Sequence, residues 1–126
     1  MPKARPLIAV VDDECSVCSA LKRLIRSAGM DVETYPSGEE FLQAIQIRQP
    51  DCIVLDLHMP KVTGFEVQSQ LAKSWPRVPV VVITGHDTPE SRARVLAGRA
   101  AAYLLKPIDE RMLLETIAGA IAKAGA

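Results

Sequence analysis

Short apolar runs alternate with helical patterns along the whole chain, and this alternation most constrains the fold. Short runs that are apolar almost throughout are typical of strands covered on both faces of a sheet. The runs of this kind are Leu7–Val11, Cys52–Leu55, Val80–Ile83 and, more weakly, Ala102–Leu105. Asp31–Tyr35 alternates between polar and apolar residues, which indicates a strand at the edge of a sheet.

A helical pattern follows each predicted strand. Ser37 and Glu40 form a capping-box pattern at the start of the second helix, and Thr88 followed by Pro89 predicts the start of the fourth. Gly29 is a typical residue for the end of the first helix. Five strand–helix units in succession predict an α/β protein with a doubly wound parallel sheet and helices on both faces. Sites in such folds lie beyond the carboxyl ends of the strands.

Length and charge narrow the class of protein. The 126 residues fit one domain, so we expect residues 1–126 to form a single domain with an ordered core over about 6–123 and no effector domain. The formal net charge of zero argues against direct nucleic-acid binding. No apolar run approaches the ~18 residues that span a bilayer, and no signal-peptide pattern is present, which predicts a cytoplasmic protein. Lys3 and Arg5 are expected to belong to a solvated terminus.

Four apolar runs end in polar residues. Asp12 and Asp13 follow the first run, Asp56 follows Cys52–Leu55, and Thr84 and Lys106 follow the last two. The carboxyl ends of parallel strands lie at one edge of a sheet, so we expect these side chains to converge there. A single strand-end Asp or Thr often only caps a helix, but capping does not explain the lysine or the acidic pair.

The residue types in this group suggest a chemistry. Three carboxylates held together repel one another, so the site either raises a pKa or binds a cation. Oxygen ligands favour Mg²⁺, which also neutralises phosphoryl oxygens. Lys106 adds a compact positive charge and Thr84 a hydroxyl group. The set suits phosphoryl transfer onto an aspartate.

The chain resembles response-regulator receiver domains of the CheY-like superfamily over nearly its whole length. The matching segments are Val10–Glu14, Val54–Pro60 with Gly64, Val82–Gly85 and Tyr103–Pro107. Residues 84–86 (Thr-Gly-His) are most similar to the FixJ-type branch. The resemblance implies the flavodoxin-like strand order 2-1-3-4-5 and a phosphoacceptor domain of a two-component system, not an enzyme that turns over an external substrate. The implied partner is a histidine kinase or phosphotransfer protein.

The resemblance also implies site roles. Asp56 would be the phosphoacceptor. Asp13 and Asp56 would bind Mg²⁺ directly, together with the backbone carbonyl of His58, and Asp12 would act through a coordinated water. Lys106 would pair with Asp56 at rest and with a phosphoryl oxygen after transfer.

A conformational switch is implied as well. Thr84 would hydrogen-bond the phosphoryl group, and Tyr103 matches the aromatic switch position. Gly85 matches the small residue that leaves the acceptor accessible. The bond between Lys106 and Pro107 would be cis, which costs little at proline.

The output face of the family comprises the fourth helix, fifth strand and fifth helix. In this chain it would carry basic residues followed by acidic ones, namely Arg92, Arg94, Arg99, Asp109, Glu110 and Glu115. A two-fold contact could match the two sets, which predicts a phosphorylation-dependent homodimer. The alternative is an ordinary solvated surface and a different output protein.

One position departs from the family. A glycine usually stands seven positions before the lysine, where this chain has Arg99, and Gly98 comes one residue earlier. We expect Gly98 to end the fourth helix in the left-handed conformation. The departure leaves the register of that helix open.

Several other motifs have alternative interpretations. Cys15 and Cys18 form a C-x-x-C pattern, but the neighbouring acidic residues would raise thiol pKa values, whereas redox cysteines need lowered ones. His58 and His86 are either exposed loop residues or residues that tune the lifetime of the acyl phosphate.

Three other functions are less well supported. An aspartate-nucleophile phosphatase usually has a second acid two residues after the nucleophile, where this chain has His58. A flavin-binding module would need a phosphate-binding loop after the first strand, where this chain is acidic. An interaction module that does not use phosphate is disfavoured, because the chain has the expected residue type at all five key positions: Asp12, Asp13, Asp56, Thr84 and Lys106.

Overall fold

The computed structural model describes residues 5–125, so Lys3 lies outside the described residues. Strands and helices alternate five times, as the sequence predicts. The elements are β1 (Leu7–Val11), α1 (Cys15–Ser27), β2 (Asp31–Tyr35), α2 (Gly38–Ile45), β3 (Cys52–Asp56), α3 (Gly64–Ser74), β4 (Val80–Thr84), α4 (Pro89–Ala97), β5 (Ala102–Leu105) and α5 (Glu110–Ala124).

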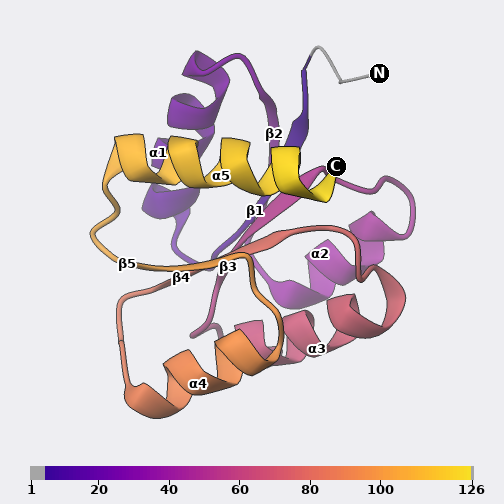
Figure 1. The fold of residues 1–126 in the computed structure, drawn as a ribbon, viewed down its shortest axis with the longest axis vertical. Helices are drawn as coiled ribbons and strands as arrows, with labels where there is room; N and C mark the ends of the chain where they lie inside the picture. The colour runs from indigo at the N-terminus through magenta and orange to yellow at the C-terminus, as the bar shows by residue number, and fades with distance from the viewer. Residues whose placement is uncertain (1–4, 126) are drawn as a thin grey trace.

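The five strands form one parallel sheet in the order β2-β1-β3-β4-β5. Helices α1 and α5 cover one face, and α2, α3 and α4 cover the other (Figure 1). The predicted doubly wound fold and strand order are confirmed, and β2 lies at an edge as its alternating pattern indicates. Val11 pairs with Leu55, and Asp56 pairs with Ile83, so the carboxyl ends of β1, β3 and β4 lie side by side.

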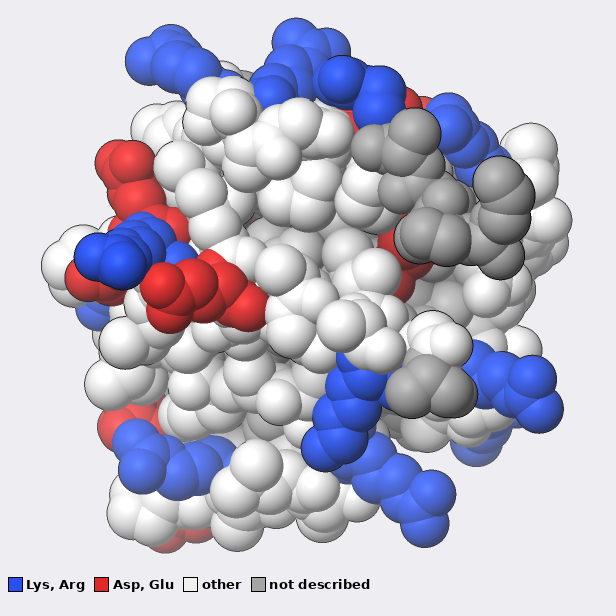
Figure 2. All heavy atoms as spheres, turned by 45° about the horizontal axis from the view of Figure 1, so that its top comes forward, with Lys and Arg blue, Asp and Glu red and all other residues white. Residues whose placement is uncertain are grey.

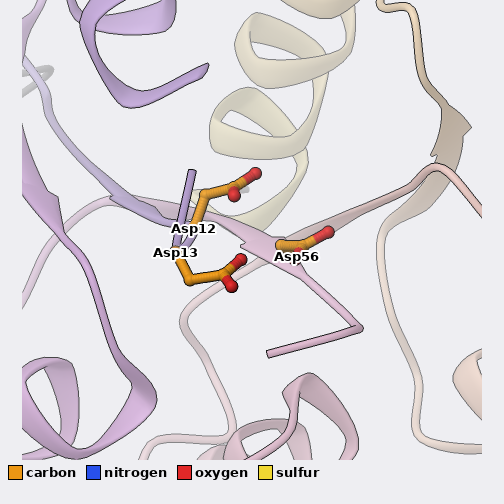
Figure 3. Close-up of side chains that lie close together, drawn as sticks. All are labelled: Asp12, Asp13 and Asp56. Atoms are coloured by element: carbon orange, nitrogen blue, oxygen red, sulfur yellow. The ribbon is translucent and has the colours of Figure 1, made fainter. Parts of the chain in front are cut away.

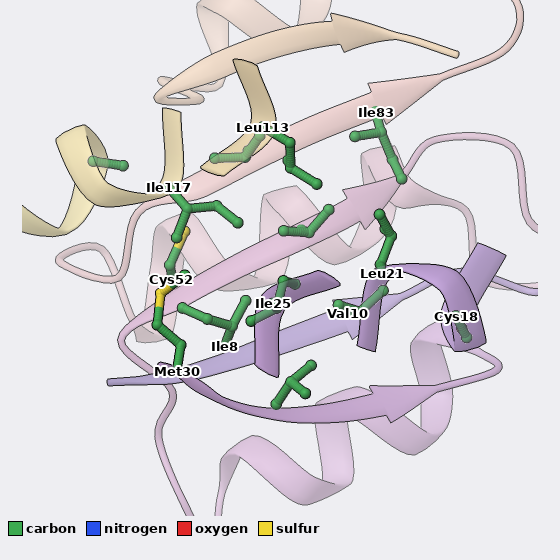
Figure 4. Close-up of a cluster of buried hydrophobic side chains, with 14 residues drawn as sticks. Ile8, Val10, Cys18, Leu21, Ile25, Met30, Cys52, Ile83, Leu113 and Ile117 are labelled. Carbon is green, nitrogen blue, oxygen red and sulfur yellow. The ribbon is translucent and has the colours of Figure 1, made fainter. Parts of the chain in front are cut away.

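Every residue of β1, β3 and β4 is buried. Side chains alternate between the two faces of these strands, so the sheet separates two apolar clusters. Figure 4 shows the cluster under α1 and α5, in which Leu21 and Ile25 of α1 and Leu113 and Ile117 of α5 pack on the same face of the sheet. The second cluster joins the other face to Phe41, Val67 and Val95 of α2, α3 and α4, among others. Each fully buried side chain of this size contributes about 1.5–3 kcal/mol. The two clusters hold the strand ends in fixed positions.

Side-chain caps begin most of the helices. Ser37 accepts a hydrogen bond from the backbone N–H of Glu40, and Thr88 begins α4 with Pro89 in its first turn, as predicted. Helix α3 begins with a complete capping box between Thr63 and Glu66, which the sequence analysis did not identify. Glu14, the N-cap residue of α1, makes no side-chain cap.

The predicted end of α4 is wrong in one respect. Gly98 has a φ of −79°, and Arg99 adopts the left-handed conformation with a φ of 63°. Gly98 leaves space for the Gln68 side chain, because an added Cβ would lie 2.6 Å from its Nε2. That buried amide donates a hydrogen bond of 2.9 Å to the carbonyl of Val95. A contact with α3 therefore explains the glycine.

Charged side chains lie mainly toward the edge of the face shown in Figure 2. On the face shown in Figure 2, Lys and Arg lie around a largely uncharged centre. Arg5, predicted to be solvated, is exposed but forms an ion pair with Asp31 at 3.0 Å. Within residues 5–125, no helix combines the length and apolar character that a membrane crossing requires.

Candidate functional site

Three carboxylates meet at the carboxyl edge of the sheet. Asp12 and Asp13 directly follow β1, and Asp56 is the last residue of β3 (Figure 3). One oxygen of each lies within 4.8 Å of the others. Asp12 and Asp56 are buried, while Asp13 is exposed. The fold thus brings together all three acidic residues that the sequence analysis selected.

The loop after β3 folds closely against the end of that strand because of Gly64. Its N–H donates to the carbonyl of Leu57 at 2.9 Å. An added Cβ would lie 2.6 Å from the Cα of Leu57, and the backbone of Asp56 is also in the way. Gly64 belongs to a family-like segment of the sequence, and its physical role is to permit the close approach of two backbone segments.

Lys106 lies among three carboxylates. Its Nζ is 2.9 Å from Oδ2 of Asp12, 3.1 Å from Oε1 of Glu14 and 3.3 Å from Oδ1 of Asp56. The pairing with Asp56 that the family implies is present, but it is the longest of the three. The contact with Glu14 was not predicted, because nothing in the spacing of residues 14 and 106 indicates it.

Burial and neighbouring charges change the proton affinities in this group. Burial, followed by the charge of Asp12, raises the pKa of Asp56 to about 6, although Lys106 opposes the change. Burial by itself would lower the pKa of Lys106, but its close contacts with the carboxylates of Asp12 and Glu14 and the charge of Asp56 raise it above its ordinary value. At neutral pH the site therefore contains an ionised Asp56 beside a stable ammonium group.

The donor set fits a hard divalent cation. All the candidate ligand atoms are oxygens, and one ammonium does not balance the charge of the surrounding carboxylates. Oδ2 of Asp12 is buried and, among residues 5–125, its close partner is the ammonium of Lys106. His58 follows Asp56 by two residues and has an exposed side chain.

Thr84 and Gly85 lie at the end of β4, next to β3. The Thr84 hydroxyl is bonded within its own loop: it donates to the carbonyl of His86 at 3.3 Å and accepts from the N–H of His86 at 3.1 Å. Gly85 is exposed, and an added Cβ would make only an ordinary contact with Lys106 at 3.8 Å. The peptide bond between Lys106 and Pro107 is cis.

Tyr103 lies on β5 and is held by two residues of the α4 region. Its hydroxyl donates to Oδ1 of Asp87 at 2.9 Å. Asp87 also forms an ion pair with Arg92 at 2.7 Å, and the Arg92 guanidinium lies 5.4 Å from the centre of the Tyr103 ring. The three side chains form a closed set of contacts on the surface of α4 and β5.

The other noted motifs occupy the margin of the site. His58 and His86 are exposed, and their rings are in edge contact with centroids 5.6 Å apart. Cys15 is exposed and Cys18 is buried. Burial raises the pKa of Cys18 most, and the charge of Asp12 adds to it, which agrees with part of the predicted effect of the acidic residues and argues against a redox role for Cys18.

The sequence and the fold are both similar to those of known proteins. The family described as "Response regulator receiver domain" matches residues 8–118. This chain belongs to that family. Among its relatives is the response regulator protein TodT of Pseudomonas putida, which is 35% identical over 116 residues, a match that covers 91% of this chain and 51% of TodT.

Solved structures of response-regulator proteins have the same fold as this chain. The receiver protein from Burkholderia phymatum is 41% identical with a TM-score of 0.83, and the match covers 94% of this receiver domain and 96% of that chain. The chemotaxis protein CheY4 of Vibrio cholerae is 29% identical with a TM-score of 0.87, covering 93% and 99%. The chain spans about half the length of the first curated relatives that it matches.

Proposed function

We propose that Asp56 accepts a phosphoryl group from a phosphohistidine of a histidine kinase or phosphotransfer protein. The observation that supports this most directly is the convergence of Asp56 with two other carboxylates and the ammonium of Lys106 at one sheet edge. An Asp56 oxygen would attack phosphorus, the bond from phosphorus to the donor nitrogen would break, and the imidazole would leave. The product is an acyl phosphate on Asp56.

Asp13 and Asp56 would bind Mg²⁺ directly with the backbone carbonyl of His58, and Asp12 would contribute through a coordinated water. When bound, the ion would neutralise the phosphoryl oxygens. Asp12 is suited to an indirect role because its buried carboxylate is already paired with Lys106 at 2.9 Å. Asp13 is exposed and forms no ion pair with another of residues 5–125, so it can bind an incoming ion without losing one.

After transfer, Lys106 would pair with one phosphoryl oxygen. The Thr84 hydroxyl would leave the backbone of His86 and hydrogen-bond a second phosphoryl oxygen. Gly85, beside Thr84, would leave the acceptor accessible to the donor. Movement of Thr84 would open space on the inner side of β5, into which Tyr103 would turn. Because Tyr103 is joined to Asp87 by a 2.9 Å hydrogen bond, this turn would also release the α4 region.

The output of the switch would be the face formed by α4, β5 and α5. Leu96, Leu105 and Met112 are exposed there, and they supply apolar area for a phosphorylation-dependent homodimer. The charges of this face are partly engaged within the chain: Arg92 pairs with Asp87, and Arg94 lies 4.2 Å from the Phe65 ring. We therefore expect apolar contact to contribute more to the dimer than the charge matching suggested by the sequence.

The wider assignment is also a proposal. Residues 84–86 favour the FixJ-type branch, and residues 1–126 would form a single cytoplasmic receiver domain that does not itself bind nucleic acid. Its catalysis would be limited to its own phosphorylation and dephosphorylation.

Labelling with acetyl phosphate and Mg²⁺ tests the proposal. Intact-mass spectrometry should detect one added phosphoryl group, and Asp56→Asn should abolish it. Glu39→Gln, which removes an exposed carboxylate of α2, should be labelled like the wild type. Equal labelling of Asp56→Asn would refute the assignment. Sustained hydrolysis of small phosphoesters would instead support a phosphatase.

A further inference from the structure

Glu14 occupies the N-cap position of α1 but does not cap the helix. Ser, Thr, Asp and Asn are preferred at this position because a short side chain can accept a hydrogen bond from the first turn. The Glu14 side chain makes no such bond, and its own N–H donates to Oδ1 of Asp12 at 2.9 Å. Its carboxylate instead reaches Lys106, 92 residues further along the chain, at 3.1 Å.

This contact uses one of the three N–H donors of the Lys106 ammonium. The other carboxylates around the ammonium are Asp12 and Asp56, and Asp56 is the most distant of the three. A phosphoryl oxygen on Asp56 can take the place of the Asp56 carboxylate oxygen, but Asp12 and Glu14 still hold the ammonium on its other side, and a closer approach requires one of them to let go. The side chain of Asp12 is fully buried, whereas that of Glu14 is 59% exposed and can exchange Lys106 for water. Glu14 is the partner that is released at the lowest cost.

We propose that Glu14 is a positioning residue that holds the Lys106 ammonium away from the acceptor and competes with the phosphoryl group for it. This inference rests on the proposed function of Asp56. In the resting site, the Lys106 ammonium lies closer to the Glu14 carboxylate (3.1 Å) than to that of Asp56 (3.3 Å). When its carboxylate is out of reach, Lys106 can approach Asp56 and the incoming group, so phosphorylation should be faster and the phosphoryl mimic beryllofluoride should bind more tightly.

Two substitutions separate contact from charge. Glu14→Asp keeps the negative charge but shortens the side chain by one methylene, about 1.5 Å, and draws the carboxylate toward the helix N-terminus. Glu14→Gln keeps the length and removes the charge. If direct contact matters, Glu14→Asp should raise the labelling rate with acetyl phosphate and the affinity for beryllofluoride about two- to five-fold, the range that a partly exposed ion pair supports. If only the overall field matters, Glu14→Asp should match the wild type and Glu14→Gln alone should differ. Glu39→Asp, an equivalent change on exposed α2, is the control and should have no effect.

Heteronuclear NMR of the Lys106 ammonium group gives a readout that does not depend on activity. Its signal should shift in Glu14→Asp, while a urea titration should show that the fold is retained. An unchanged Lys106 signal, or labelling rates of Glu14→Asp equal to the wild type, overturns the role of Glu14. Absence of labelling at Asp56 in the wild type would instead refute the proposed function, so the two failures are distinguishable.

Discussion

Replacing Gly98 by alanine should destabilise the protein, although alanine is ordinarily the better residue in and around helices. The φ of −79° at Gly98 is open to any residue, so the cost arises from space. The new Cβ would lie 2.6 Å from Nε2 and 2.8 Å from Cδ of Gln68. The Gln68 side chain is buried, and moving it breaks its hydrogen bond to Val95. Overpacking of this kind costs about 1–3 kcal/mol, and about 1 kcal/mol of this corresponds to the lost hydrogen bond.

Urea denaturation of Gly98→Ala should therefore give a lower midpoint with an unchanged slope, and the melting temperature should fall by roughly 3–6 °C for each kcal/mol. Gly119→Ala is the matched control, because Gly119 lies within α5 and an added Cβ meets nothing within 4 Å. It should stabilise the protein by about 0.5–1 kcal/mol. Gln68→Ala should remove most of the cost of Gly98→Ala when the two are combined. A stabilising Gly98→Ala, or an unchanged cost in the Gln68→Ala background, would refute the explanation.

Three further predictions can be tested on the same protein. Arg99→Gly should stabilise the chain by about 1 kcal/mol in urea titrations, because Arg99 has a φ of 63° that glycine adopts without strain. Asp87→Ala removes the acceptor of the Tyr103 hydroxyl, so ¹⁹F NMR of fluorotyrosine-labelled protein should show a larger inward population of Tyr103 before phosphorylation; an unchanged spectrum would mean that Asp87 does not hold the ring. Without divalent cations, the free energy of unfolding should fall by up to about 3 kcal/mol as the pH rises from about 4 to about 6. The reason is that Asp56 binds its proton more tightly in the folded chain (pKa about 6) than in the unfolded chain (pKa 3.8), and this stabilisation is lost when the proton leaves. Asp56→Asn should remove that slope in urea titrations at several pH values.

The sheet and the acidic part of the site could be predicted because their signals are local and their consequence is geometric. Runs such as Cys52–Leu55 are apolar throughout because both faces of β3 are covered. Parallel strands then place their carboxyl ends at one edge, which brings Asp12 and Asp56 together whatever the loops do. The strand order itself came from the resemblance, since periodicity alone does not rank the possible orders.

The features that could not be predicted depend on contacts between elements distant in sequence. The Glu14 contact with Lys106 depends on where α1 begins relative to β5 and on the rotamers of two long side chains. The interpretation of Gly98 failed because a glycine near a helix end usually indicates a left-handed residue, whereas here it makes room for Gln68. A buried glutamine in α3 has no signature in the apolar pattern, so the role of its glycine partner stayed hidden.

These unpredicted contacts bear on how phosphorylation would reach the surface. Helix α4 has a single buried residue, Val95, and its other attachments are polar or cationic: the Gln68 amide at one end and the Arg94 guanidinium over Phe65. Elements with few buried apolar contacts are the ones that move at low free-energy cost. Tyr103 is hydrogen-bonded to Asp87, just before the start of this same helix. A change at Thr84 that moves Tyr103 would therefore act on α4, the helix that can shift at the lowest free-energy cost. The helix with the fewest buried residues therefore belongs to the proposed output face and contacts Tyr103 directly.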